Sequence, residues 1–97
     1  MGVDVTRPKP LETHPGDEII AWAREQLRMA RSIVDNPGGG LLSATQAIGQ
    51  VRAGLEERDA ARWGPVIQSL AGAEDAAIRR EFPKARKLID EALGGLI

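Results

Sequence analysis

The sequence predicts an all-α protein, a compact bundle of four to five antiparallel helices preceded by a flexible N-terminal arm. Apolar residues recur at alternating steps of three and four in several segments, the spacing that places side chains on one face of a helix. Two tryptophans and one phenylalanine are the only aromatic residues. The core must therefore be aliphatic and rich in alanine, which suits closely packed helices better than a sheet.

Composition narrows the class of protein further. A chain of 97 residues, 42% hydrophobic and 28% charged, has the make-up of one small globular domain. A net charge of −1 provides no long-range attraction to nucleic acid or to an anionic membrane. The lack of cysteine removes disulfides, thiolate metal sites and cysteine nucleophiles. Neither a signal peptide nor a membrane span is recognisable, so we expect a cytoplasmic protein with no membrane partner.

Residues 1–16 contain three prolines among polar residues and are expected to form the flexible arm. Residues 17–97 are expected to form a single helical-bundle domain. Its first helix, 17–35, has the clearest pattern and would be capped by Asp17. Its stripe consists of Ile20, Ala23, Leu27, Ala30 and Val34. A proline and three glycines in 36–40 then end this helix.

A second helix is predicted over 44–57. Ser43 and Gln46 have the spacing of a capping box, and Leu42 stands where a hydrophobic staple would. The predicted buried stripe is Ala44, Ile48, Val51 and Leu55.

The segment after residue 59 leaves two alternatives. Either one helix over 60–70 is kinked at Pro65, or a short turn precedes a fresh helix with Pro65 in its first turn, where a missing N–H costs little. We favour the second, with Gly72 ending the helix. From 73 to 93 the three-four rhythm continues through Pro83, so one continuous apolar face is expected even if the helix is kinked or restarted there. That face is Ile78, Phe82, Ala85, Ile89 and Ala92, followed by a glycine cap at Gly94 and a hydrophobic residue, Leu96.

Residues 30–35, Ala-Arg-Ser-Ile-Val-Asp, are similar to residues 85–90, Ala-Arg-Lys-Leu-Ile-Asp, and each segment is followed by a Gly-Gly-Leu at the same offset. The two segments are either an old duplication or two amphipathic helices that converged on one pattern. We favour convergence, because two copies fall short of the three or more that usually stabilise a repeat array.

The chain offers few groups for catalysis. His14, the only histidine, lies in the proline-rich arm, and the chain has neither tyrosine nor cysteine. Paired carboxylates stand at helix ends, where adjacent side chains point in different directions. We therefore expect no catalytic, cofactor-binding or metal-binding residues and no enzymatic activity.

The candidate interaction surface lies on the first helix. Trp22 and Met29 widen its apolar side, and Arg24, Arg28 and Arg31 share one flank. Tryptophan, methionine and arginine are enriched at protein interfaces. The alternatives are that the two apolar side chains complete the core of the bundle and that the arginines form a solvated face.

Trp63, beside a Gly-Pro pair, is a further candidate for the surface, or else anchors a turn. These residues indicate a non-enzymatic protein–protein interaction module acting through a helix surface: an adaptor, an inhibitor or regulatory subunit, or an oligomerisation domain. Its partner would be another protein or a second copy. The alternative is a small nucleic-acid-associated regulator that uses the same arginines together with Arg80, Lys84 and Lys87. An enzyme with a carboxylate and arginine site that the sequence does not reveal is the least favoured reading.

Overall fold

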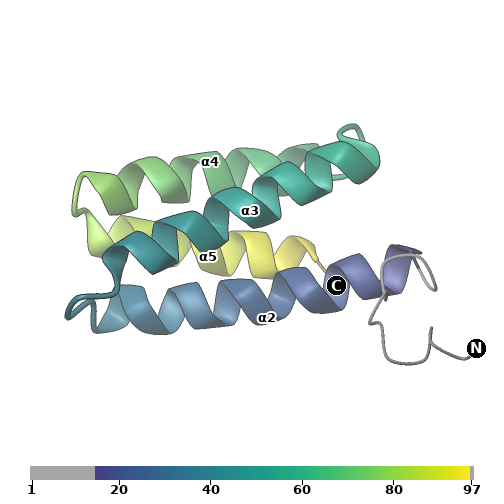
Figure 1. Cartoon of the computed structure of the whole chain (residues 1–97). Helices are drawn as coiled ribbons and strands as arrows, with labels where there is room; N and C mark the ends of the chain where they lie inside the picture. The colour runs from purple at the N-terminus through teal and green to yellow at the C-terminus, as the bar shows by residue number, and fades with distance from the viewer. Residues whose placement is uncertain (1–14, 97) are drawn as a thin grey trace, which may run out of the picture.

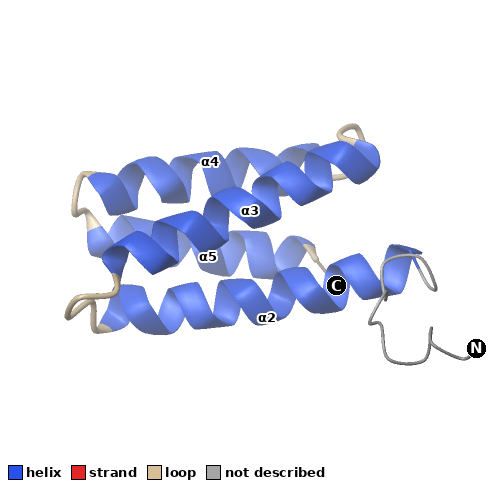
Figure 2. Ribbon diagram, viewed as in Figure 1, coloured by secondary structure: helices blue, strands red, loops and turns tan. Residues whose placement is uncertain are grey.

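The computed structural model describes residues 15–96 as a compact, all-helical globule (Figures 1 and 2). Its four helices are α2 (Pro15–Asp35), α3 (Leu41–Asp59), α4 (Gly64–Ile78) and α5 (Phe82–Gly95). They lie side by side, and their connections alternate between the two ends of the molecule (Figure 1). Each helix contacts two others, because α2 and α4 both pack against α3 and α5. None of the four helices is long and apolar enough to cross a membrane.

The core is aliphatic and alanine-rich, as predicted. Leu27 of α2, Leu55 of α3, Leu70 of α4 and Ile89 of α5 are completely buried, so every helix contributes to one cluster. The predicted stripe of α3 is buried in full, and that of α2 is buried except for Ile20, which is half-buried. The three-four spacing therefore identified the inward faces of both helices.

Two predicted helix starts were wrong. Because α2 includes Pro15 and Gly16, Asp17 lies within its first turn and is not its N-cap. Residues 1–14, which include His14 and most of the expected arm, lie outside the described residues.

The capping box predicted for the second helix was also wrong. Because α3 begins at Leu41, its N-cap is Gly40, which has no side chain to donate or accept a bond. Gly38 adopts a positive φ of 48°, a conformation that glycine accepts readily, and the Gly40 N–H donates to the Pro37 carbonyl oxygen at 2.7 Å. This tight turn lets the helix start early. Leu42 is 69% exposed and therefore does not act as a hydrophobic staple.

The favoured alternative for the third helix is confirmed at its start, since α4 begins at Gly64 with Pro65 in its first turn. Its predicted end at Gly72 was wrong, because the helix continues to Ile78. A Cβ at Gly72 would lie only 3.1 Å from Leu88 Cδ1 of α5. The glycine therefore serves close helix approach here and does not end the helix.

The expected continuous face through Pro83 was wrong as well. The chain turns at residues 79–81, where Arg80 has a φ of 64°. The Glu81 N–H donates to the Ala76 carbonyl at 2.8 Å and the Arg80 N–H to the Ala77 carbonyl at 3.0 Å, the pair of bonds that defines a Schellman motif. The turn leaves Ile78 66% exposed, although Leu96, just beyond α5, is buried as expected.

Candidate interaction surface

Trp22 belongs to the contact between α2 and α3. Its side chain is half-buried and packs against the core cluster. A Cβ at Gly54 of α3 would lie 3.1 Å from Trp22 Cζ3 and 3.3 Å from Cη2, so the indole ring covers this glycine. The structure thus places Trp22 inside the fold for much of its area.

Met29 is the residue of the predicted surface that remains accessible as a large apolar side chain, with 46% of its area exposed. Arg28 beside it is exposed, and Arg24 is half-buried. Trp22 and Arg31 are also partly exposed, but both make contacts with neighbouring helices.

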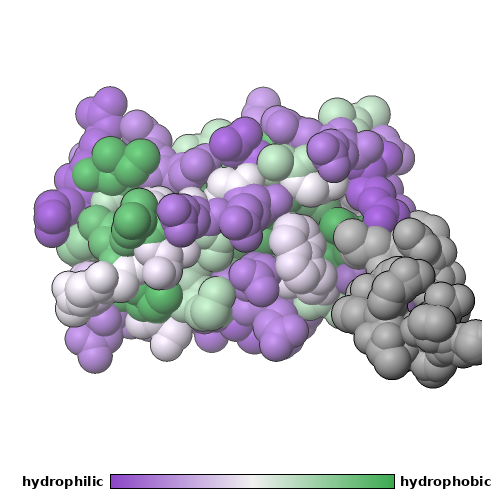
Figure 3. All heavy atoms as spheres, in the orientation of Figure 1, coloured by the Kyte–Doolittle hydropathy of each residue, from purple (hydrophilic) through white to green (hydrophobic). Residues whose placement is uncertain are grey.

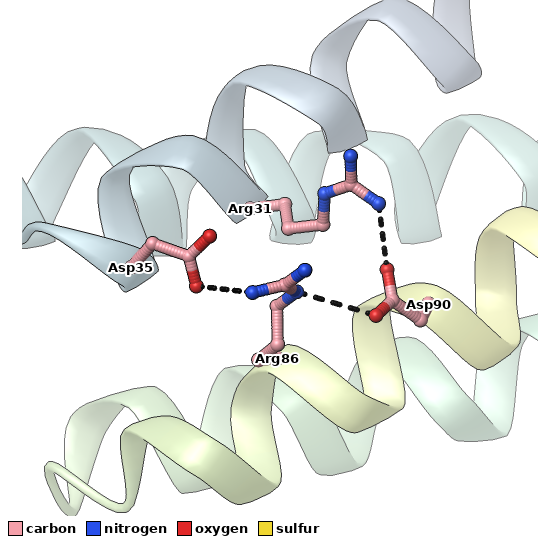
Figure 4. A network of polar contacts seen from close by, with 4 residues as sticks. All are labelled: Arg31, Asp35, Arg86 and Asp90. Atoms are coloured by element: carbon pink, nitrogen blue, oxygen red, sulfur yellow. Dashed lines mark hydrogen bonds and ion pairs between the residues drawn. The ribbon is translucent and has the colours of Figure 1, made fainter.

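Arg31, the last arginine of that row, is bound within the fold (Figure 4). Its Nη1 donates to Asp90 Oδ1 of α5 at 3.0 Å. Arg86 of α5 donates from Nη1 to Asp35 Oδ1 of α2 at 2.6 Å and from Nε to Asp90 Oδ2 at 3.2 Å. The four side chains form one network, the α2–α5 tetrad, that links the two helices. Its charges cancel, so it offers little net attraction to an outside ion.

The charges of the tetrad also stabilise one another. The hydrogen bond from Arg31, together with the charges of Arg86 and Arg31, holds the pKa of Asp90 below its usual range. The hydrogen bond to Asp35 and the two carboxylate charges raise the pKa of Arg86 above its ordinary value. Both shifts favour the charged forms of Asp90 and Arg86.

The tetrad coincides with the internal similarity of the sequence. Arg31 and Asp35 occupy the positions in residues 30–35 that Arg86 and Asp90 occupy in residues 85–90. Each arginine binds the aspartate of the other segment. The order of buried, half-buried and exposed positions is also identical in the two segments. The two segments thus make equivalent contacts with each other, whether they arose by duplication or by convergence.

Trp63 lies in the core, with only 5% of its area exposed. It is the N-cap of α4, where its N–H donates to the Asp59 carbonyl and its carbonyl accepts from the Ile67 N–H. The guanidinium carbon of Arg62 lies 4.4 Å from the ring centroid. The structure therefore places Trp63 at a turn anchor and not on an accessible surface.

Leu42 and Ile78 were not among the predicted surface residues, although they are the most exposed large apolar side chains among the described residues. An open groove of about 500 Å³ begins at Ile78 and follows α3 from Thr45 to Ala53. Leu42 lies one turn before Thr45, whose Oγ1 donates to the Leu42 carbonyl at 2.9 Å. Figure 3 shows hydrophobic residues gathered at this end of the molecule, where α3 begins and α4 ends. We call Leu42, Ile78 and the groove the α3–α4 surface.

One charged pair crosses the groove. Arg52 Nε donates to Glu74 Oε1 at 3.0 Å, and Arg52 Nη1 lies 3.8 Å from Glu56. The hydrogen bond and the charge of Glu74 raise the pKa of Arg52. The other lining residues are uncharged: Thr45, Gln46, Gly49, Gln50, Ala53 and Ile78.

A sequence signal for this surface did exist. No Asp, Glu, Lys or Arg occurs from residue 36 to residue 51, although 28% of the chain is charged. Within this uncharged stretch and just beyond it, Leu42, Gly49 and Ala53 recur at steps of seven and four, the spacing of a single helix face. That face lies opposite the buried stripe of α3.

The second basic row named in the sequence, Arg80, Lys84 and Lys87, is exposed at the start of α5 and in the turn before it. Lys84 Nζ lies 4.0 Å from a Glu81 oxygen. Because Arg31 is also paired with a carboxylate, neither basic row presents its full charge to a polyanion. No group of three or more metal-ligating side chains comes together within residues 15–96.

No protein-family model matches the chain, and comparisons with curated proteins and with solved structures find no significant similarity. Function must therefore be argued from the geometry of the molecule itself.

Proposed function

We propose that this chain is a non-enzymatic protein–protein interaction module, an antiparallel helical bundle that binds its partner through the α3–α4 surface. It would serve as an adaptor, an inhibitor or regulatory subunit, or an oligomerisation domain. The observation that carries the proposal is the exposure of Leu42 and Ile78, 69% and 66%, beside an open groove. Large apolar side chains gathered next to a groove are typical of contact sites.

The free energy available at this surface supports a binding role. Removing a leucine or isoleucine side chain fully from water contributes about 1.5–3 kcal/mol. Leu42 and Ile78 leave most of that contribution unused in the isolated chain. A partner that covers both would recover it, and the nearby Gln46 and Gln50 can donate and accept hydrogen bonds at the edge of the contact.

The polar side chains support a binding role over a catalytic one. The hydrogen bonds of Asp35, Glu74 and Asp90 join them to arginines of neighbouring helices. A general acid at neutral pH needs a raised carboxyl pKa, whereas the pKa of Asp90 is lowered. These groups are arranged to hold helices together.

The test removes the apolar character of the surface without touching the core. The double variant Leu42→Glu, Ile78→Glu, and each of its two single variants, are compared with Met29→Glu, which places one such charge at an exposed apolar position of α2. Proteins of the source cell that are retained by the immobilised chain are quantified by mass spectrometry, with copies of the chain itself included. We expect the double variant to lose proteins that the wild type and Met29→Glu both retain.

Equal retention by all of these chains would contradict the assignment of the surface. Retention of nucleic acid that disappears with added salt, unaffected by any of the variants, would instead favour the nucleic-acid-associated alternative. Circular dichroism of each variant establishes that the helices are intact.

A further inference from the structure

The outward face of α3 has a feature that a contact with a second copy would use. The residues of this face are large at one end and small at the other: Leu42 is exposed near the start of α3, Gly49 follows two turns later near the middle, and Ala53 follows one turn after Gly49. If two such faces meet with the helices antiparallel, Leu42 of each copy lies against Ala53 of the other, and Gln46 lies against Gly49. The large Leu42 then meets the small Ala53, the condition for close helix packing, and Gln46 meets the Glu74 carboxylate that lies over Gly49.

Charge favours the same arrangement. The overlap covers residues 42–53, in which Arg52 is the only charged residue. In this register Arg52 is level with Ser43 of the other copy, and Glu56 is level with Gly39. Glu74 of α4 also lies on this surface, over Gly49, and its charge is paired with that of Arg52 within the same copy.

We infer that the α3–α4 surface binds a second copy of this chain, with the two α3 helices packed antiparallel about a two-fold axis between Gln46 and Gly49. Such an axis makes the contact isologous, so the same patch serves both copies and closes the assembly at two. Ile78, which lines the groove along α3, adds a second exposed apolar side chain to this surface in each copy. This inference rests on the proposed function, because it names the partner of the same surface.

The first experiment measures molar mass by sedimentation over a concentration series of the full chain. We expect a monomer–dimer equilibrium whose dissociation constant rises at least about tenfold in Leu42→Glu, because a buried charge replaces an apolar contact. Ala53→Glu on the facing position should weaken the dimer to a similar extent. The matched controls are Met29→Glu and Ala21→Glu, which introduce the same changes at exposed positions of α2 and should alter the dissociation constant less than about twofold.

The second experiment tests the direction of packing. Because the chain contains no cysteine, Leu42→Cys and Ala53→Cys each introduce one unique thiol. A mixture of the two variants treated with a short thiol-to-thiol cross-linker should yield mainly the mixed dimer. In the mixed dimer the two thiols face each other at one 42–53 contact, and the other contact keeps the unaltered Leu42 and Ala53. Parallel helices would instead cross-link each variant to itself and would overturn the two-fold arrangement.

Two further outcomes separate this inference from the proposed function. A monomer at all concentrations, combined with loss of a different retained protein in Leu42→Glu, Ile78→Glu, would overturn the second copy as partner while the surface assignment holds. A dimer weakened by Met29→Glu and not by Leu42→Glu would place the self-contact on α2 and overturn both.

Discussion

The helices α2 and α3 use their apolar residues in opposite ways. Helix α2 is strongly amphipathic, and neighbouring helices cover most of its wide apolar face. Trp22 packs on Gly54 of α3, and Arg31, at the edge of that face, binds Asp90 of α5. Helix α3 is only weakly amphipathic, because apolar residues lie on two opposite faces of it. Leu55 is completely buried on its inner face, and Leu42 is exposed on its outer face.

The difference shows where an uncovered surface should be sought in a small helical bundle. A helix that packs against two neighbours needs a wide apolar arc, so excess width on α2 indicates two intramolecular contacts. A helix whose apolar residues lie on two opposite faces can bury only one of them in a bundle this small. The weaker amphipathic pattern is then the better indicator of an uncovered apolar face.

The largest expected effect is the difference in stability between two leucine-to-alanine substitutions, one on each face of α3. Leu55→Ala should lower the free energy of unfolding by about 2–5 kcal/mol, because it leaves a cavity in the core. Leu42→Ala should change it by less than about 0.5 kcal/mol, because the side chain is largely in solvent. Urea unfolding at low protein concentration measures both. A comparable cost at Leu42 would show that it has an intramolecular contact and is not free to bind.

The next effect concerns the predicted surface of α2. Trp22→Ala should destabilise the chain by about 2 kcal/mol, roughly half of what a fully buried tryptophan contributes, because the ring covers Gly54 and packs on the core. Met29→Ala should cost less than about 0.5 kcal/mol. Thermal and urea unfolding measure the difference. If the two variants were equally stable, Trp22 would return to the set of surface residues available to a partner.

A smaller difference in stability is expected between alanine substitutions at two glycines of α3. An alanine at Gly49 gains helix propensity, up to about 1 kcal/mol, and its Cβ would meet only the flexible end of Glu74, 2.8 Å from Oε2. An alanine at Gly54 gains the same propensity but meets the rigid indole of Trp22 at 3.1 Å. We therefore expect Gly49→Ala to be more stable than Gly54→Ala by about 1 kcal/mol in urea unfolding. Equal stabilities would indicate that Trp22 moves away easily.

The fold class and most of the core could be predicted because helix periodicity is a local property. Residues such as Ala23, Leu27, Ile48 and Leu55 follow the three-four rhythm and are all buried. Helix ends were harder, because they depend on contacts that are distant in sequence. From the sequence alone, Gly72 predicts the end of a helix; in the structure it lies within α4 and makes room for Leu88 of α5.

The candidate surface was harder to predict from the sequence than the helix ends were. The turn at 79–81 places an arginine, Arg80, in the left-handed conformation where a glycine would be expected, so nothing in the local sequence announced it. If one helix ran on through residues 79–81, Ile78 would belong to the same buried stripe as Phe82 and Ala85. With the turn, Ile78 is exposed and lines the groove along α3, although it belongs to the next helix, α4.

The tetrad provides the smallest effect and the last test of the contrast between α2 and α3. Hydrogen bonding from Arg31 lowers the pKa of Asp90, so a titration followed by NMR should place it below the value of about 3.9 for an unfolded aspartate. Arg31→Gln should raise that pKa, whereas Arg28→Gln, one turn earlier on the exposed side, should not.

The sign of the stability change follows from the lowered pKa. A carboxylate with a depressed pKa in the folded state stabilises it above about pH 4, and this contribution is lost as the pH falls through the folded-state pKa. Arg31→Gln should therefore make unfolding less sensitive to pH below about 4, by no more than about 1 kcal/mol, because Arg31 and Asp90 are each about two-fifths exposed. An unchanged pKa of Asp90 in Arg31→Gln would mean that Arg31 is free in solution. The arginine row of α2 would then be available to a partner, and the contrast with α3 would rest on the apolar side chains alone.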